Sequence, residues 1–351
     1  MDNNKRILIT GNNGYIGSVM APWFRSQGYD VTGLDTGYFS ACTLVPDIAP
    51  IPTLLKDVRD IAPRDLEGYD AVIHLAALSN DPIGNLNETW TREINGDGTI
   101  RLATAAKQAG VSRFLFSSSC IMYGMSVAAV VDETAPLAPQ TEYARSKFVA
   151  ETALSAMADD NFSPTFCRNG TVYGISPRMR FDTVLNNLMA SAFTNGRVAI
   201  HSDGTPWRPV VHVQDVARAF QAVLEAPREA VHNEAFNTGA AHLNHQIREL
   251  GEIVAQTVPG CVLEMVPQPG ADQRTYKADF GKFKRTFPTF AFLWDARKGA
   301  EELRAGFERA GLTHRDFTDR RFTRLNWLRH LLDTALVDDA LRWNKPATRV
   351  A

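Results

Sequence analysis

Residues 6–17 have the sequence RILITGNNGYIG, an apolar run followed by three glycines. The run at 6–10 predicts a β-strand, and the residues after Gly17 predict a helix. Gly11, Gly14 and Gly17 therefore lie in the turn between a strand and a helix. Glycines let this backbone turn sharply and approach a pyrophosphate, which the free N–H groups of the helix then bind. The stretch predicts a dinucleotide site, although a plain surface turn can have the same three glycines.

The chain continues with the same alternation of strands and helices. Further strands are predicted at 30–34, 71–75 and 114–117, with helical stretches between them. Strands such as 71–75 are apolar without alternation, which is typical of strands covered on both faces in a parallel sheet. We therefore predict an α/β fold, a Rossmann-type doubly wound parallel sheet with a smaller C-terminal substrate-binding lobe.

Three regions follow from this pattern. Residues 1–170 are expected to form the dinucleotide-binding domain, which also carries the catalytic side chains. Residues 171–290 should mainly form the substrate-binding lobe, with some segments returning to the sheet. Residues 291–351 are charged and have apolar positions at helical spacing, so we predict a solvated C-terminal helical cap.

Composition restricts the partners of the protein. The 351 residues carry 37 Lys and Arg against 39 Asp and Glu, a net charge of −2, which provides no field to hold a polyanion. Nucleic acid is therefore not an expected partner. The first apolar run, residues 7–9, is too short for a signal peptide or a membrane span, so we expect no membrane association and a cytoplasmic location.

Cysteine and histidine spacing gives no sign of a metal site. The four cysteines are far apart and should be reduced thiols: Cys42, Cys120, Cys167 and Cys261. His242 and His245 are three residues apart but have no third ligand nearby, so no metal is expected.

An acidic residue ends the second predicted strand. Asp35 lies 18 residues after Gly17, where a carboxylate can accept hydrogen bonds from the ribose diol of an adenosine. Its charge would repel a 2′-phosphate, and no Arg follows it directly. These features favour NAD over NADP as the cofactor.

A tyrosine and a lysine one helical turn apart are the candidate catalytic pair. Tyr143 and Lys147 share one face of a predicted helix. A phenol titrates near pH ~10, and a neighbouring ammonium favours the phenolate, which makes Tyr143 a candidate general acid and base. A Tyr and a Lys at this spacing are common on solvated helix faces. Here, however, they follow a strand that ends in three serines, 117–119, whose hydroxyls can bind the same substrate oxygen.

With these motifs, the chain resembles the extended short-chain dehydrogenase/reductases of the NAD-dependent sugar-nucleotide epimerase/dehydratase family. The resemblance runs from residue 7 to about residue 220. Besides the glycine run and the catalytic helix, it rests on four segments: Asp57-Val58, His74-Leu75-Ala76-Ala77, Asn95, and Ser117-Ser118-Ser119 followed by Tyr123-Gly124.

The resemblance implies a role for each matching residue. Tyr143 would be the acid and base, Lys147 would lower its pKa and bind the nicotinamide ribose, and Ser119 would hold the substrate oxygen. The implied cofactor contacts are Gly11, Asn13, Gly14, Tyr15, Ile16, Gly17, Asp35, Asp57, Val58, Leu75, Ala76, Ala77, Asn95, Ser117, Tyr143 and Lys147. The implied substrate contacts are Ser79, Ser119, Asn169, Asn187, Arg208 and Arg274, the two arginines forking onto a diphosphate.

The residues after Ser119 bear on the reaction. In the 4,6-dehydratase branch of the family, an Asp-Glu pair follows this position, but here the residues are Cys120 and Ile121. Neither can protonate a leaving hydroxyl as a carboxylic acid does, so dehydration is disfavoured. Cys120 has two interpretations, a catalytic acid/base thiol or a small buried side chain.

The sequence thus predicts an NAD-dependent epimerase that acts on a nucleotide-diphosphate sugar, at the sugar 4-position. An NAD(P)H-dependent 4-ketoreductase and a non-catalytic dinucleotide sensor are the alternatives. The family resemblance also implies a homodimer formed by a four-helix bundle, built from the helix after Asn95 and the helix that carries Tyr143. Apolar positions for such an interface include Leu102, Ala103 and Ala106.

Overall fold

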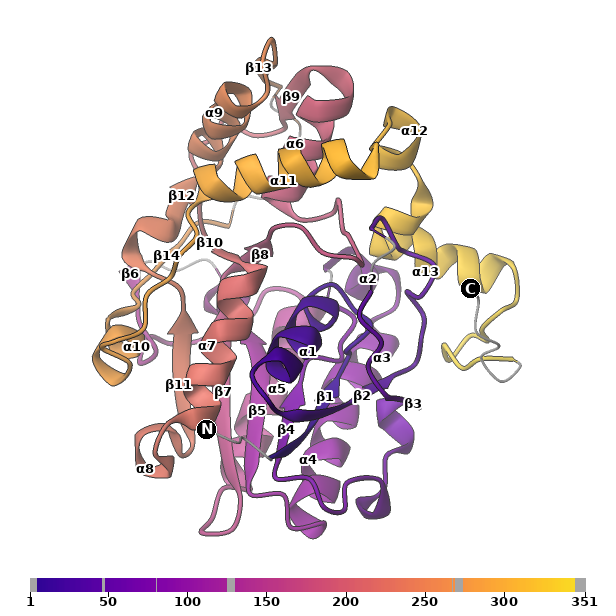
Figure 1. The fold of residues 1–351 in the computed structure, drawn as a ribbon, viewed down its shortest axis with the longest axis vertical. Helices are drawn as coiled ribbons and strands as arrows, with labels where there is room; N and C mark the ends of the chain where they lie inside the picture. The colour runs from indigo at the N-terminus through magenta and orange to yellow at the C-terminus, as the bar shows by residue number, and fades with distance from the viewer. Residues whose placement is uncertain are drawn as a thin grey trace.

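The computed structural model describes residues 5–45, 48–79, 81–124, 130–266, 268 and 274–344. The outer ends of the predicted first and third regions therefore lie outside the described residues. A seven-stranded sheet, parallel throughout, forms the centre of the larger domain (Figure 1). Its strands in spatial order are β11 (Glu234–Thr238), β7 (Ser163–Asn169), β5 (Arg113–Ser119), β4 (Ala71–His74), β1 (Arg6–Thr10), β2 (Asp30–Asp35) and β3 (Thr53–Leu55).

Helices cover both faces of this sheet, as the apolar strands predict. Ile7 and Ile9 of β1 pack on one side with α1 (Gly17–Ser26) and α7 (Val213–Glu225), which face the viewer in Figure 1. Leu8, between them, packs on the other side with α4 (Gly98–Gln108) and α5 (Glu142–Ala156). The alternation follows from the two-residue period of a strand. The predicted Rossmann-type fold is confirmed.

The strand before the catalytic helix ends in the three serines, as predicted. β5 extends two residues beyond the predicted range 114–117, to Ser119. It does so because β7 pairs with it over the whole length, up to Ser119 opposite Asn169. The serines are therefore held on a rigid strand end and not in a loop.

A smaller lobe covers the carboxyl ends of these strands. Its core lies among α6 (Val184–Asn195), α9 (Ile247–Thr257) and α11 (Ala296–Ala310). Its strands are β8 (Thr171–Tyr173), β9 (Arg197–Ile200), β10 (Trp207–His212), β12 (Asn244–Gln246) and β13 (Val262–Met265), and a further pair joins β6 (Val130–Val131) to β14 (Lys277–Ala278). The chain thus crosses between the lobes several times, because α7 and β11 lie within the region predicted to form the lobe.

The C-terminal region is not the solvated cap that its charge pattern suggests. Leu303 and Phe307 of α11 are buried in the core of the smaller lobe. Leu328 and Leu331 of α13 (Arg324–Asp333) are buried in the core of the larger domain. The apolar stripes of these helices pack into the two cores, so the C-terminal region contacts both lobes.

Short elements complete the described chain. The α-helices are α2 (Asp81–Leu86), α3 (Glu88–Thr91), α8 (Arg228–Val231), α10 (Gly281–Thr286) and α12 (His314–Phe317). The other helical turns are η1 (Val58–Asp60), η2 (Pro63–Asp65), η3 (Arg92–Asp97), η4 (Cys120–Tyr123), η5 (Ala241–Leu243) and η6 (Arg320–Phe322).

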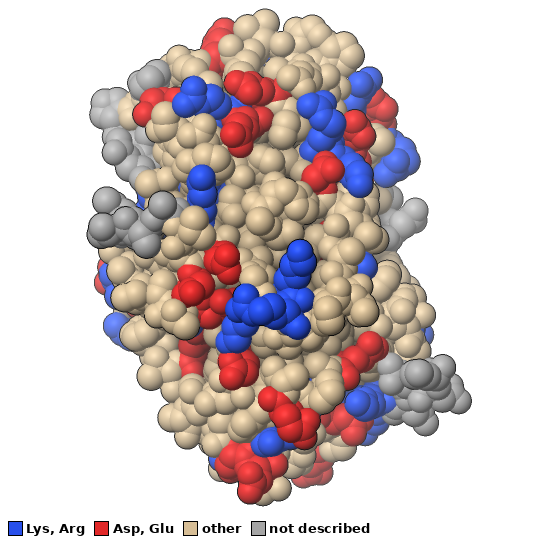
Figure 2. Space-filling model, turned by 90° about the vertical axis from the view of Figure 1, so that its left-hand side faces the viewer, with Lys and Arg blue, Asp and Glu red and all other residues tan. Residues whose placement is uncertain are grey.

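Charges on the surface are mixed. Figure 2 shows acidic and basic side chains interspersed over one side of the molecule, as the near-zero net charge suggests. In the part of the chain that the structure describes, no helix has the length and apolar character needed to cross a membrane. Four free cysteines agree with the prediction of reduced thiols.

Candidate active site

A cavity of about 1020 Å³ lies between the carboxyl ends of the sheet strands and the smaller lobe. This is the edge of an open α/β sheet where ligands bind. The glycine turn, the pair Tyr143 and Lys147, and the pair Arg208 and Arg274 all line this one cavity. Of the predicted contacts, only Asn13, Asn95 and Cys120 are absent from its lining.

The glycine turn has space only for glycine. Gly11 has φ of +72°, and a Cβ there would lie 2.8 Å from the backbone nitrogen of Ala76. A Cβ on Gly17 would lie 2.1 Å from the carbonyl oxygen of Gly11. Strand, turn and helix are thus as close as a backbone that binds a pyrophosphate requires. The turn fits a dinucleotide.

Asp35 holds the turn in place and lines the cavity. Its carboxylate accepts hydrogen bonds from the backbone nitrogens of Asn13 at 3.0 Å and Gly37 at 2.7 Å. Burial raises the pKa of Asp35, against these two bonds and the charges of Arg178 and Arg324. Those two arginines correct one premise of the sequence argument. No Arg follows Asp35 in sequence, but two act on it in space.

Asp57 is bound to other side chains. Burial alone would raise its pKa, but hydrogen bonds and charge from Arg59, with the charge of Arg342, outweigh burial and hold the pKa of Asp57 below its usual value. The Arg59 Nη2 to Asp57 Oδ2 distance is 2.7 Å. Asp57 and Val58 both line the cavity. An adenine that contacts the Asp57 carboxylate would do so while Arg59 and Arg342 remain bound to it.

Asn95 acts through the loop that follows β4. It is 1% exposed, and its side chain amide donates to the carbonyl oxygen of Leu78 at 3.1 Å and accepts from the Leu78 nitrogen at 2.8 Å. Asn95 is not among the residues that line the cavity, and its direct cofactor contact stays a prediction. Asn95 positions the loop whose residues Leu75, Ala76 and Ala77 line the cavity.

His74 precedes this loop and is a buried histidine whose two ring nitrogens both have partners. Its ring nitrogens contact the hydroxyls of Thr10 at 2.6 Å and Thr99 at 2.8 Å. Burial, with the charge of Lys147, lowers the pKa of His74 to about 3. The imidazole is therefore neutral at physiological pH.

Ser119 and Tyr143 meet at the middle of the cavity. The Ser119 hydroxyl hydrogen-bonds Tyr143, and Tyr143 begins the first turn of α5, which Thr141 caps by accepting from the Ala144 nitrogen at 3.2 Å. Burial, reinforced by the charge of Asp81, raises the pKa of Tyr143 to about 12, against Arg180 and the Ser119 bond. The Lys147 ammonium lies 5.9 Å from the centre of the Tyr143 ring, and the expectation that it lowers this pKa stays a prediction.

Lys147 is buried one turn further along α5. It is 3% exposed, its ammonium donates to the carbonyl oxygen of Ser117 at 2.7 Å, and it lies 4.4 Å from the centre of the Phe116 ring. Burial lowers the pKa of Lys147 to about 7, against the charge of Glu151. A cation with so little solvent is strongly stabilised by any hydroxyl or anion that enters the cavity.

Cys120 points away from the reacting groups. It is 0% exposed, and its thiol donates to the carbonyl oxygen of Arg168 at 3.1 Å. Burial raises the pKa of Cys120, so the thiolate is disfavoured. The catalytic interpretation of Cys120 is therefore wrong, because the turn of η4 directs the thiol into the core and leaves Ile121 at the cavity wall.

Three further predicted contacts lie at the substrate side of the cavity. The Asn169 amide donates to the Ser117 hydroxyl at 3.1 Å, and its own oxygen is buried without a hydrogen-bond partner. The Asn187 amide donates to the Phe181 carbonyl oxygen at 2.7 Å. Ser79 accepts from Arg180 at 2.9 Å. The unsatisfied oxygen of Asn169 indicates a missing hydrogen-bond donor, such as a hydroxyl of a ligand.

The two arginines predicted to bind a diphosphate are adjacent. The Arg208 guanidinium donates to the carbonyl oxygen of Arg274. Arg274 in turn forms an ion pair with Asp81, with a distance of 2.8 Å. Residues 178 to 182, which the sequence analysis did not single out, add Arg180, fully buried beside Tyr143 and paired with Asp182 at 2.7 Å. Their only sequence signal was a charged run, R-M-R-F-D, directly before a helix.

Fold and cavity together define a dinucleotide-binding protein of the oxidoreductase type, with Ser119, Tyr143 and Lys147 in the same cavity. A family model described as the NAD dependent epimerase/dehydratase family matches residues 7–239. The chain belongs to this family, and its cofactor is NAD. The cavity lining fits this cofactor at the glycine turn, at Asp35 and at the ammonium of Lys147.

Relatives within the family have different reactions. The chain is 27% identical to the UDP-glucose 4-epimerase of Corynebacterium glutamicum, over 80% of this chain and 89% of the relative. It is 26% identical to the dTDP-D-glucose 4,6-dehydratase of Mus musculus, over 63% and 64% of the two chains. A solved structure of MoeE5 in complex with UDP-glucose and NAD has a TM-score of 0.74 at 26% identity, covering 88% of this chain and all of that one. These comparisons do not support excluding a dehydratase.

Proposed function

We propose that the protein is an NAD-dependent 4-epimerase of a nucleotide-diphosphate sugar. The observation that carries the proposal is that one cavity is lined by the glycine turn, by the Ser119, Tyr143 and Lys147 group, and by Arg208 with Arg274. Arg274 pairs with Asp81, whose charge acts on Tyr143, so a sugar whose diphosphate binds the arginines would have its ring near Tyr143.

The chain's own groups handle the proton. Tyr143 as phenolate takes the proton of the sugar 4-hydroxyl, Ser119 holds the same oxygen, and the Lys147 ammonium stabilises the negative charge. NAD, held by the glycine turn, Asp35 and Lys147, would supply a reversible hydride acceptor at the sugar carbon. Because burial disfavours the phenolate of Tyr143, a positive charge near Tyr143 must lower its pKa for this step.

The 4-ketoreductase remains the second candidate, since it uses the same three residues. Two positions favour either of these reactions over a 4,6-dehydratase. Cys120 is turned into the core, and the apolar Ile121 lines the cavity where that branch has a carboxylic acid.

The test is a panel of UDP-, GDP-, dTDP- and CDP-sugars followed by NMR. We expect one sugar to be converted into its 4-epimer without net consumption of NAD, and Tyr143→Phe to abolish this while NAD binding persists. Arg274→Gln should raise KM for that sugar at least tenfold with a smaller effect on kcat. Loss of water from the sugar, or NADPH consumption at one equivalent per turnover, would contradict the epimerase.

We also propose a homodimer through α5, one of the two helices first expected, but not through the apolar positions named for the other helix. Leu102, Ala103 and Ala106 are buried in the core of the monomer and cannot contact a partner. Phe148 and Val149 of α5 are 39% and 48% exposed, so the helix still offers an apolar surface. Val149→Asp should yield a monomer in sedimentation experiments, and an unchanged dimer would contradict this interface.

A further inference from the structure

An arginine of the C-terminal helix lines the cofactor end of the cavity. Arg324 is the first residue of α13, more than 300 residues after the glycine turn, and it is 3% exposed. Its Nη2 donates to the carbonyl oxygen of Arg178 at 2.9 Å, and its guanidinium lies 4.5 Å from the centre of the Phe39 ring. Its Nη1, however, is buried without a hydrogen-bond partner.

Arg324 is a buried cation among charges of both signs. The charges of Arg180 and Arg178 oppose its own, whereas Asp182 favours it and accepts from its backbone nitrogen at 3.1 Å. Asp182 also pairs with Arg180 at 2.7 Å, and Asp35 accepts two backbone hydrogen bonds. Burial lowers the pKa of Arg324 to about 10, which reflects the cost of burying this cation. An anion beside the guanidinium would reduce that cost.

The position of Arg324 indicates which anion it binds. Arg324 lines the same cavity as Asp35, which fastens the glycine turn, and Tyr15 within that turn, and its charge acts on both. The turn is the part of the cavity that fits a pyrophosphate. We propose that Arg324 binds the pyrophosphate of the NAD cofactor from the side opposite the glycine turn, so that the C-terminal region forms part of the cofactor site.

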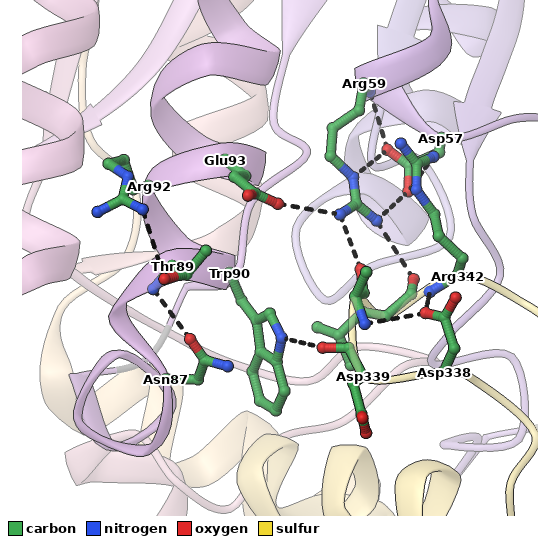
Figure 3. Close-up of polar contacts among 12 residues, drawn as sticks. Asp57, Arg59, Asn87, Thr89, Trp90, Arg92, Glu93, Asp338, Asp339 and Arg342 are labelled. Atoms are coloured by element: carbon green, nitrogen blue, oxygen red, sulfur yellow. Dashed lines mark hydrogen bonds and ion pairs between the residues drawn. The ribbon is translucent and has the colours of Figure 1, made fainter.

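A set of contacts at the adenosine end of the cavity holds α13 in this position. We call residues 334–344, which follow α13, the C-terminal strap. Figure 3 shows Arg59 and Trp90 directed at the strap, Trp90 donating to the carbonyl oxygen of Asp339 at 2.7 Å. Arg59 donates to the carbonyl oxygen of Ala340 at 2.8 Å, and Arg342 pairs with Asp57 at 3.3 Å.

Further contacts join the strap and α13 to the loop after β2. The Trp343 ring nitrogen donates to the carbonyl oxygen of Thr36 at 2.7 Å, and that of Trp327 donates to the carbonyl oxygen of Tyr38 at 2.6 Å. The Tyr38 hydroxyl donates to the Leu341 carbonyl oxygen. With both ends of this region tied to the cofactor domain, Arg324 is ordered before any ligand enters, which lowers the entropic cost of binding.

The test compares Arg324→Gln with Arg329→Gln, since Arg329 is an exposed arginine of the same helix. The readouts are the NAD content of the protein as purified and calorimetric titrations with NAD, ADP-ribose, adenosine and UDP. We expect Arg324→Gln to weaken the binding of NAD and ADP-ribose about ten- to a hundredfold, which is the range of a charge-assisted hydrogen bond. The affinities for adenosine and UDP should stay within about twofold of the wild type. Arg329→Gln should bind all four as the wild type does.

Other outcomes would overturn the proposal. Unchanged NAD and ADP-ribose binding with a lower melting temperature would make Arg324 a structural tie, and a selective loss of UDP would assign it to the sugar-nucleotide. Because burial makes Gln a disruptive replacement, Arg324→Lys is the second variant: it retains the charge without the fork and should show intermediate affinity. The inference rests on NAD binding and not on epimerisation, so failure of the proposed reaction leaves these titrations unaffected.

Discussion

Asp81 and Arg274 form an ion pair of 2.8 Å between α2 and the smaller lobe, beside Tyr143. Asp81 also accepts from the Thr141 hydroxyl at 2.7 Å, and Thr141 is the N-cap of the catalytic helix α5. The Asp81 carboxylate therefore contacts two groups. One is Arg274, which we propose binds the substrate diphosphate, and the other is Thr141, which caps the helix that carries Tyr143. Charge changes at the diphosphate end of the cavity are thereby coupled to Tyr143.

Asp81→Asn should move the pH dependence of kcat to lower pH. The charge of Asp81 raises the pKa of Tyr143, so its removal lowers that pKa and makes the phenolate available at lower pH. We expect the rising limb of the pH–rate profile to shift down by about 0.5 to 1 unit. Asp97→Asn, at an exposed carboxylate, is the control. A shift to higher pH would refute the coupling.

Gly17→Ala should abolish NAD binding. An alanine stabilises most helices by about 1 kcal/mol relative to glycine, but here its Cβ would lie 2.1 Å from the Gly11 carbonyl oxygen, and backbone cannot move aside cheaply. We expect at least a hundredfold weaker NAD binding by calorimetry. Gly96→Ala is the matched control, because a Cβ at that position would have nothing within 4 Å. Equal affinities of the two variants would show that the turn does not hold the cofactor.

Lys147→Met should remove a pH dependence of stability. The pKa of Lys147 is about 7 in the fold against 10.5 unperturbed. Below pH 7 both states are protonated and burying the ammonium destabilises the fold. Between these two values only the unfolded chain keeps the proton, so the stability of the wild type rises with pH.

Denaturant unfolding at pH 6.5 and 8.5 measures this effect. The wild type should gain about 1 to 2 kcal/mol relative to Lys147→Met between the two pH values, within the limit of ~1.4 kcal/mol per pH unit. The exposed Lys284→Met variant should follow the wild type. If the stability of the wild type relative to Lys147→Met instead fell with pH, Lys147 would be charged and well paired in the fold.

Cys120→Ala should retain activity. The thiol is buried away from the cavity and its pKa is raised by burial, so it takes no part in proton transfer. We expect kcat within about twofold of the wild type, and a loss of about 1 kcal/mol of stability from the small cavity. A hundredfold lower kcat in a normally folded variant would restore the catalytic interpretation.

Local patterns in the chain were sufficient for the fold and the centre of the site. The apolar run at 6–10, the glycines that follow and the four-residue spacing of Tyr143 and Lys147 predicted β1, the turn and the catalytic face of α5. These features depend on the period of a strand or a helix and on the space at a glycine. Each is decided within a short stretch of neighbouring residues, so the sequence alone determines it.

Contacts between distant segments depended on the tertiary structure. The direction of Cys120 follows from the turn of η4, and the extension of β5 to Ser119 follows from pairing with β7. Arg324 reaches the cofactor site because α13 packs into the core of the larger domain. The pKa values of Tyr143 and Lys147 likewise come from burial, which no spacing reveals. The sequence thus determined which chemical groups the site has, while packing decided which of them meet and how strongly each holds its proton.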